Sequence, residues 1–377
     1  MSNPIRYSSV CLEAFAYTLP EQVVGSEEIE SSLEPLYRRL RLPEGRLELM
    51  TGIRQRRFWP PGMLPSEKSV ETAEKAIRIA GLDKRHVGAL IHGSVCRDFL
   101  EPATACGVHH RLGLPGDCLV YDVSNACLGL LNGMIQVANM IELGQIRAGV
   151  VVGTESSRAL VETTIKQLNA DRSLSRRDIK SAFASLTIGS GSAAVVLVHR
   201  ELSRTGNRIL GGVARANSAH CELCQSDRDQ SADAAMRPLM ATDAETLMQE
   251  GIAAAKETLP HFLACLDWEV EHIDKTFCHQ VGRAHRKLTL EAFGLDPAVD
   301  YATLEWLGNT GAVALPITAA LGIENGHLRP NDRVALMGIG SGINVIMLGV
   351  DWQRSLVENE ARPPAPHAKT FGIPSVR

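Results

Sequence analysis

The chain has 377 residues, of which 45% are hydrophobic and 22% are charged, and its formal net charge is −4. This balance lacks the basic surface that nucleic-acid binding requires, so we expect no nucleic-acid partner. The chain opens without an apolar signal core and contains no apolar run long enough to span a membrane, which favours a cytoplasmic location.

The first half of the chain alternates between apolar runs and helical patterns. Three apolar runs predict buried strands, at 88–95, 118–126 and 148–156. Two amphipathic segments predict helices, at 102–112 and 127–145. This alternation indicates an α/β fold with buried sheets.

The second half repeats this order of elements. It predicts helices at 245–266, 284–295 and 313–326, a strand at 274–281, and two strands joined by a glycine turn within 333–352. The segment 185–201 is the first-half counterpart of the last pair, and both contain the letters IGSG between apolar arms. We therefore expect two similar halves at 1–201 and 245–352, a polar connecting segment at 202–244, and a flexible tail at 353–377.

Nine cysteines at irregular spacing, without a secretion signal, indicate reduced thiols and not a disulfide framework. One C-x-x-C pair, Cys221 and Cys224, stands beside His220. A structural zinc site needs about four ligands, and no second pair lies at suitable spacing. We therefore expect no metal, and the question becomes which thiol reacts.

Cys127 stands where a predicted strand meets a predicted helix. The positive end of a helix dipole favours a thiolate, and the N–H of Cys127 can donate to a developing oxyanion. Ala126 and Gly129 leave space for a thioester on either side. Burial as a structural residue is the commoner fate of a thiol, so the position of Cys127 alone leaves both roles open.

Two further residues carry suitable chemistry in the second half. His279 lies at the end of a buried run, where it can act as an acid–base partner or donate a hydrogen bond to a substrate carbonyl. Asn309 lies in a glycine-rich turn before a helix, where its amide can point an N–H at an anion. A core histidine and a simple turn asparagine are the ordinary alternatives.

Taken together, these residues resemble the Cys–His–Asn triad of the ketoacyl-ACP synthase III branch of the thiolase superfamily. The resemblance covers about residues 5–352. It is carried by NACLG around Cys127, HQVGR from His279, GNTGA around Asn309, GIGSG at 338–342 and GIRQRR at 52–57.

This resemblance implies a five-layered α-β-α-β-α fold built from two fused halves and assembled as a homodimer. It implies coenzyme A thioesters as substrates, no permanently bound cofactor, and an oxyanion hole made by the N–H groups of Cys127 and Ser341. The family often has glycine at the latter position, and serine still supplies an N–H. The residues that contact coenzyme A are not identified by the sequence.

The stretch SVCRDFLEPATAC at 94–106 resembles the olefin-biosynthesis condensing enzymes of OleA type, which join two long-chain acyl-CoAs head to head. Their glutamate at the position of Glu101 reaches across the dimer interface into the partner's active site. When neither substrate loses CO₂, an α-proton must be removed, and a desolvated carboxylate is a suitable base. The alternative for Glu101 is a surface charge at the start of the helix predicted from Pro102.

The leading hypothesis is an acyltransferase of lipid metabolism that condenses two fatty acyl-CoAs to a β-keto acid or its thioester, in fatty-acid or olefin biosynthesis. The principal alternative is a decarboxylating ketoacyl synthase that extends an acyl-CoA with malonyl-ACP, with acyl carrier protein as partner. A thioester hydrolase would use the same cysteine with water as the second substrate. An inactive thiolase-fold partner subunit is disfavoured by the complete triad.

Overall fold

One mixed sheet of ten strands organises the chain in the computed structural model, which describes residues 4–176, 179–226 and 240–357. Across the sheet the order is β12 (Lys275–Cys278), β13 (Arg333–Gly340), β14 (Asn344–Asp351), β9 (Arg208–Ala216), β2 (Val10–Thr18), β8 (Gly191–His199), β7 (Ala148–Glu155), β5 (Val87–His92) and β6 (Leu119–Asp122). The short strand β1 (Ile5–Arg6) pairs with β9.

The sheet has two halves with the same pairing pattern. They meet between β2 and β9, where Cys11 lies opposite Arg208. Within each half, the strand nearest this junction pairs antiparallel with the next one, as β2 with β8 and β9 with β14. A second antiparallel pair and then a parallel pair follow on each side. This repeated order confirms the prediction of two similar halves.

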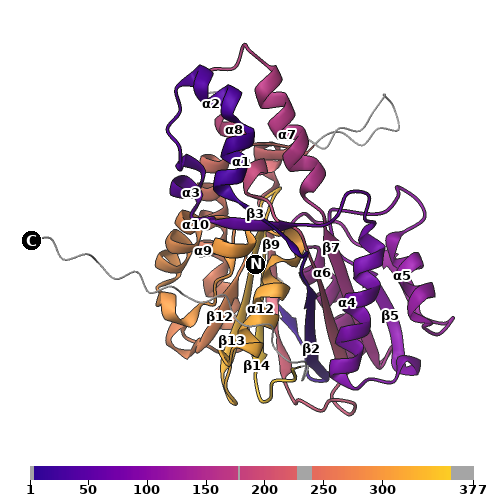
Figure 1. The fold of residues 1–377 in the computed structure, drawn as a ribbon. Coiled ribbons are helices and arrows are strands. Elements are labelled where there is room, and N and C mark those ends of the chain that lie inside the picture. The colour runs from indigo at the N-terminus through magenta and orange to yellow at the C-terminus, as the bar shows by residue number, and fades with distance from the viewer. Residues whose placement is uncertain (1–3, 177–178, 227–239, 358–377) are drawn as a thin grey trace, which may run out of the picture.

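Helices form three layers around the two halves (Figure 1). The central layer contains α6 (Gly129–Glu142) and α12 (Ala314–Glu324), whose side chains share one core with strands of both halves. The outer layers are α4 (Pro65–Ala80) with α5 (Thr104–Leu112), and α9 (Ala244–Leu266) with α10 (Arg283–Phe293). The chain therefore has the predicted α-β-α-β-α arrangement.

A further group of helices packs at one end of the sheet, toward the top of Figure 1. It consists of α1 (Ser26–Ser32), α2 (Glu34–Leu40), α3 (Arg46–Thr51), α7 (Arg158–Ala170) and α8 (Lys180–Phe183). Two small pairs of strands and one short helix complete the fold: β3 (Gln22–Gly25) with β4 (Gln55–Phe58), β10 (Cys224–Ser226) with β11 (Met240–Thr242), and α11 (Leu304–Leu307).

Several expected boundaries need correction. Residues 208–216 form β9 inside the second half of the sheet, so the segment 202–244 is more than an irregular connection. The backbone N–H and carbonyl groups of β9 form hydrogen bonds with β14. This pairing allows the run to form a central strand although polar segments flank it. Residues 358–377 of the expected flexible tail lie outside the described residues. All nine cysteines are free thiols.

Within the part of the chain that the structure describes, no helix combines the length and the apolar character needed to cross a membrane.

Candidate active site

Cys127 lies in a tight turn between β6 and α6. Ala126 adopts a left-handed backbone conformation with φ 44°, which is costly for a residue with a Cβ and recurs at functional sites. The N–H of Leu128 donates to the carbonyl of Asn125 over 2.8 Å and closes the turn. Helix α6 begins at Gly129, so Cys127 precedes the helix and does not start it, contrary to the sequence-based expectation.

The glycine turn between β13 and β14 lies against this cysteine turn. A Cβ added to Gly340 would stand 2.9 Å from Leu128 Cγ and 3.7 Å from Cys127 N. The side-chain amide of Asn344 donates to the carbonyl of Ser341 over 3.4 Å and to the side-chain oxygen of Asn125 over 3.3 Å. These contacts bring the backbone around Ser341 beside the cysteine turn, and its oxyanion role remains a prediction.

The electrostatic surroundings of Cys127 differ from the sequence-based expectation. Burial, with smaller contributions from the neighbouring groups Glu155 and Cys224, raises the pKa of the Cys127 thiol to about 12. The expectation that the helix terminus favours a thiolate is therefore wrong for the resting protein. Loss of hydration and a nearby carboxylate outweigh the helix dipole, so the resting group is a thiol.

His279 follows β12 and is 3% exposed. Its backbone N–H donates to the carbonyl of Met337 over 2.9 Å, which aligns it with the end of β13. Neither ring nitrogen has a hydrogen-bond partner within the described residues. Burial, with a smaller effect from His285, lowers the pKa of His279 to about 3. The imidazole is therefore neutral at physiological pH and can donate one N–H.

Gln280 links His279 to the segment that carries Asn309. Its side-chain oxygen accepts hydrogen bonds from the N–H groups of Thr303 (3.0 Å) and Leu304 (3.1 Å). Its side-chain N–H donates to the carbonyl of Tyr301 over 2.7 Å. Sequence reasoning assigned no role to Gln280, although its place directly after His279 was the available signal.

Asn309 is held by hydrogen bonds on both its backbone and its side chain. Its backbone N–H donates to Thr187 O over 3.1 Å, and its carbonyl accepts from Gly189 N over 2.9 Å. Its side-chain oxygen accepts from Gly311 N over 3.0 Å. Because the amide oxygen is occupied in this way, the amide N–H groups are left to donate to a substrate.

Glu155 acts electrostatically on Cys127 and forms a hydrogen bond with the segment that follows the asparagine turn. It ends β7, is 5% exposed, and accepts a hydrogen bond from Ala312 N over 3.3 Å. It is also one of the charges that raise the pKa of Cys127. Sequence reasoning missed Glu155, because the apolar run before it indicated only a strand end.

Glu101 is exposed in the single chain, and it makes no hydrogen bond or ion pair within the described residues. The expected start of the following helix needs correction. Helix α5 begins at Thr104 and not at Pro102, and its first N–H groups donate to the carboxylate of Asp122 over 2.8 and 2.9 Å. The end of β6 thus supplies the anionic cap, which leaves Glu101 without a structural partner in its own chain.

The C-x-x-C pair has a different setting from a metal site. Across the described residues, no group of three or more histidine, cysteine, aspartate or glutamate side chains could hold a metal ion. Cys221 is exposed, whereas Cys224 is close enough to Cys127 to influence its pKa. The sequence did not indicate this proximity between Cys224 and the proposed nucleophile.

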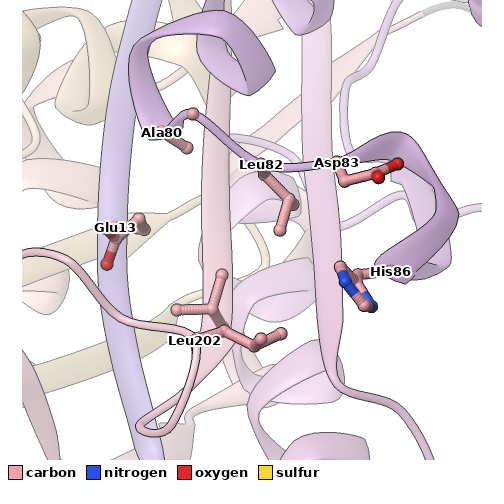
Figure 2. A pocket seen from close by; sticks show the side chains of 8 residues that line it. Glu13, Ala80, Leu82, Asp83, His86 and Leu202 are labelled. Atoms are coloured by element: carbon pink, nitrogen blue, oxygen red, sulfur yellow. The ribbon is translucent and has the colours of Figure 1, made fainter.

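A cavity of about 230 Å³ lies elsewhere in the first half (Figure 2). Its lining includes Glu13, Asp83 and His86, the last of which directly precedes the start of β5. The cysteine turn lies at the opposite end of β5, where Gly93 packs against the backbone of Gly129. This cavity is therefore separate from the candidate active site.

Two family models match the chain. The thiolase N-terminal domain matches residues 64–183, and the C-terminal domain of 3-oxoacyl-[acyl-carrier-protein] synthase III matches residues 263–352. An acyl-CoA:acyl-CoA alkyltransferase from Shewanella oneidensis is 44% identical over 351 residues, which cover 92% of this chain and 100% of that protein. A protein of the same name from Xanthomonas campestris is 34% identical and covers 92% of this chain and 99% of its own length.

Solved structures of OleA from Xanthomonas campestris have the same fold. A variant with a glutamate replaced by alanine has a TM-score of 0.86 and 34% identity, covering 92% of this chain and 99% of that one. A variant with a cysteine replaced by serine, solved with bound lauric acid and lauroyl-CoA, has the same TM-score and identity and is covered completely.

Proposed function

Because this chain belongs to the family of acyl-CoA:acyl-CoA alkyltransferases, condensing enzymes of the thiolase superfamily, we propose that it joins two fatty acyl-CoAs through an acyl-Cys127 intermediate. The chain is an acyltransferase with the thiolase fold. The observation that supports the residue-level proposal is the place of Glu155, which raises the pKa of Cys127 and accepts a hydrogen bond from Ala312 just after the Asn309 turn. We place the reaction in the cytoplasm, where the free cysteines stay reduced.

In the first step, Cys127 Sγ attacks the carbonyl carbon of an acyl-CoA. The bond between that carbon and the coenzyme A sulfur breaks, and coenzyme A leaves with the proton of the thiol. The negative charge on the carbonyl oxygen is stabilised by the N–H groups of Cys127 and Ser341, whose turns lie in contact. The step needs no bound cofactor, because the thioester substrate is already activated.

In the second step, the carbonyl oxygen of another acyl-CoA accepts hydrogen bonds from His279 and Asn309. Loss of its α-proton makes an enolate, and both donors stabilise the charge on the enolate oxygen. A neutral imidazole suits this role, because it still carries one N–H that can donate a hydrogen bond to the enolate oxygen. The α-carbon attacks the acyl group on Cys127, which releases the thiol and gives a β-ketoacyl-CoA or, after hydrolysis, the β-keto acid.

We assign the removal of the α-proton to Glu101 of a second copy of the chain. In the Xanthomonas OleA structures, the substituted glutamate and cysteine are separated by the same number of residues as Glu101 and Cys127. In the single chain Glu101 is exposed, on a loop with the exposed apolar side chains of Val95, Phe99 and Leu100. Exposed apolar clusters of this kind mark interaction surfaces.

The edge of the sheet beside this loop supports a homodimer. Strand β6 ends the strand order, so one side of its backbone has no neighbouring strand among the described residues. Leu119 on this strand is 49% exposed. An open edge with apolar side chains is suited to pairing with another strand. A two-fold dimer across β6 would bury this edge and the loop of Glu101 together.

Purified protein incubated with a long-chain acyl-CoA alone tests the function. Mass spectrometry should show an acyl adduct on Cys127, free coenzyme A, and a β-keto product with two acyl chains. Turnover only when malonyl-ACP is added would favour the decarboxylating synthase instead. Release of the free fatty acid without a β-keto product would favour a hydrolase.

The role of Glu101 has its own test. Glu101→Gln preserves shape and hydrogen bonding but cannot accept a proton, so the acyl adduct should form while condensation and α-deuterium exchange stop. Mixing Glu101→Gln chains with Cys127→Ala chains should restore activity, because one site in each mixed dimer has both groups intact. Failure of this rescue after demonstrated subunit exchange would remove Glu101 from the partner's site.

A further inference from the structure

The buried carboxylate of Glu155 lies between two segments that carry site residues. One oxygen accepts hydrogen bonds from Val95 N over 3.0 Å and Ala312 N over 3.3 Å. The other oxygen accepts from Cys96 N over 3.2 Å. Val95 and Cys96 begin the loop that leads to Glu101, whereas Ala312 follows the turn of Asn309. One side chain thus joins two segments that are more than 200 residues apart in sequence.

The asparagine turn leaves just enough space for this carboxylate. Gly311 has φ +59°, and a Cβ added to it would stand 3.3 Å from Glu155 Cδ and Oε1. Gly311 N also donates to the side-chain oxygen of Asn309. The glycine whose N–H orients the Asn309 amide is therefore the residue that packs directly on Glu155.

We propose that Glu155 is a positioning residue of this condensing site, whose carboxylate sets the Asn309 turn relative to the loop that leads to Glu101. The inference rests on the proposed function and extends it to a residue that touches neither substrate. Burial raises the pKa of Glu155, and the hydrogen bonds from its three N–H donors act in the opposite direction and favour the ionised carboxylate. Loss of one of these bonds would leave a buried N–H unsatisfied and release one segment.

The negative charge of Glu155 has a second consequence at the nucleophile. Burial raises the pKa of Cys127, and Glu155 is the largest charged contributor in the same direction. Cys224 adds to this effect at Cys127, and Cys96 is the thiol that faces the carboxylate itself. Removing the charge of Glu155 should therefore make Cys127 easier to ionise even while it disturbs the geometry of condensation.

Glu13 offers a matched control in the first half. It is 3% exposed and also accepts three hydrogen bonds, from Ser203 Oγ (2.7 Å), Arg204 N (2.7 Å) and Thr205 Oγ1 (3.0 Å). It lines the separate cavity of Figure 2, far along the sheet from the cysteine turn. Glu13→Gln therefore reproduces the loss of a buried carboxylate without touching the site.

The experiment compares Glu155→Gln, Glu155→Asp and Glu13→Gln per folded protein. Glu155→Gln should slow condensation ~10–100-fold, by analogy with the loss of a residue that orients a metal ligand, while acylation of Cys127 falls much less. Its rate of iodoacetamide alkylation at Cys127 should rise at pH 8, because removing the charge of Glu155 removes one of the causes that raise the pKa of the thiol. Glu155→Asp keeps the charge, so it should slow condensation but leave the alkylation profile unchanged.

Amide hydrogen exchange gives a readout that needs no substrate. In Glu155→Gln, the amides of Cys96 and Ala312 should exchange faster than in wild type, and in Glu13→Gln they should not. Equal losses of condensation in the Glu155 and Glu13 variants, or unchanged exchange and alkylation in Glu155→Gln, would overturn the proposal. If the wild-type protein condensed no acyl-CoA, the proposed function would fail, while exchange and alkylation would still decide the role of Glu155.

Discussion

The two glycine turns of the duplicated halves occupy equivalent places and serve the chemistry of opposite halves. The first-half glycine turn, residues 188–191, contacts the Asn309 segment of the second half. The second-half glycine turn, residues 338–342, contacts the Cys127 turn of the first half. Each glycine turn thus supports a candidate site residue that the other half carries.

The two contacts differ in what happens to the backbone hydrogen bonds. At the first-half glycine turn, the N–H of Gly189 and the N–H of Asn309 are both donated to carbonyl groups. At the second-half glycine turn, the carbonyl of Ser341 accepts from Asn344, but its N–H has no partner within the described residues. The backbone hydrogen bonds at the first-half glycine turn are therefore satisfied and hold the Asn309 segment. The second-half glycine turn leaves the N–H of Ser341 free to donate to an oxyanion.

Replacing Cys127 by alanine should have the largest effect. Without the thiol, the site beside the second-half glycine turn lacks its proposed nucleophile. Both the acyl adduct and the release of coenzyme A should therefore disappear completely. Intact-mass spectrometry after incubation with an acyl-CoA measures the adduct directly. An adduct on another cysteine, such as Cys224, in an active Cys127→Ala protein would show that Cys127 is not the nucleophile.

Substitutions of His279 and Asn309 should slow only the second step, which is condensation. His279→Ala and Asn309→Ala each remove one donor to the enolate oxygen, which typically costs ~10²–10³ in rate. Acylation of Cys127 should persist in both variants, since the oxyanion donors proposed for the first step are backbone groups. Quenched single-turnover assays separate the two steps, and a loss of acylation with preserved condensation would reverse the assignment.

The two glycine turns can be compared directly with alanine substitutions. A Cβ at Gly189 would stand 2.0 Å from Leu307 O, so Gly189→Ala should lower the free energy of unfolding by about 1–3 kcal/mol. A Cβ at Gly340 would stand 2.9 Å from the side chain of Leu128, and this side chain can move away. Gly340→Ala should therefore cost less stability but slow acylation ~3–10-fold by displacing the cysteine turn.

Ser341→Gly is the control for this comparison. It retains the backbone N–H and removes only the hydroxyl, so the acylation rate should stay near that of wild type. Urea unfolding and acylation rates together decide the outcome. A strong loss of acylation in Ser341→Gly would assign the role at this position to the side chain and contradict the backbone oxyanion hole.

The layers were predictable because their signals are local. Apolar runs followed by helical patterns predicted both halves, and the short motifs around Cys127, His279 and Asn309 singled these residues out as candidates, whose roles stay predictions. Glu155 and Gln280 were not predictable in this way, because their roles come from hydrogen bonds to segments distant in sequence. The pKa of Cys127 was also misjudged, since burial and the Glu155 charge arise only from tertiary packing.

The second half also contains two buried histidines, His279 and His285, whose titration should appear in the pH dependence of stability. Burial lowers the pKa of His285 to about 4 and that of His279 to about 3. Unfolded histidine has a pKa of about 6.5, so the unfolded chain binds more protons below that pH. The two histidines should therefore leave the free energy of unfolding unchanged above pH 6.5 and lower it as the pH falls toward 4. Asp300 acts in the opposite sense, because burial raises its pKa to about 6.

His285→Gln isolates one member of the pair, and His261→Gln, an exposed histidine on α9, is the matched control. Urea unfolding between pH 4 and 7 should show a shallower loss of stability in His285→Gln, by at most about 1.4 kcal/mol per pH unit. The control should follow the wild-type slope. Because His285 donates no identified hydrogen bond from its buried Nδ1, the effect should come from the missing titration. An unchanged slope in His285→Gln would mean that this imidazole stays accessible to protons in the folded protein.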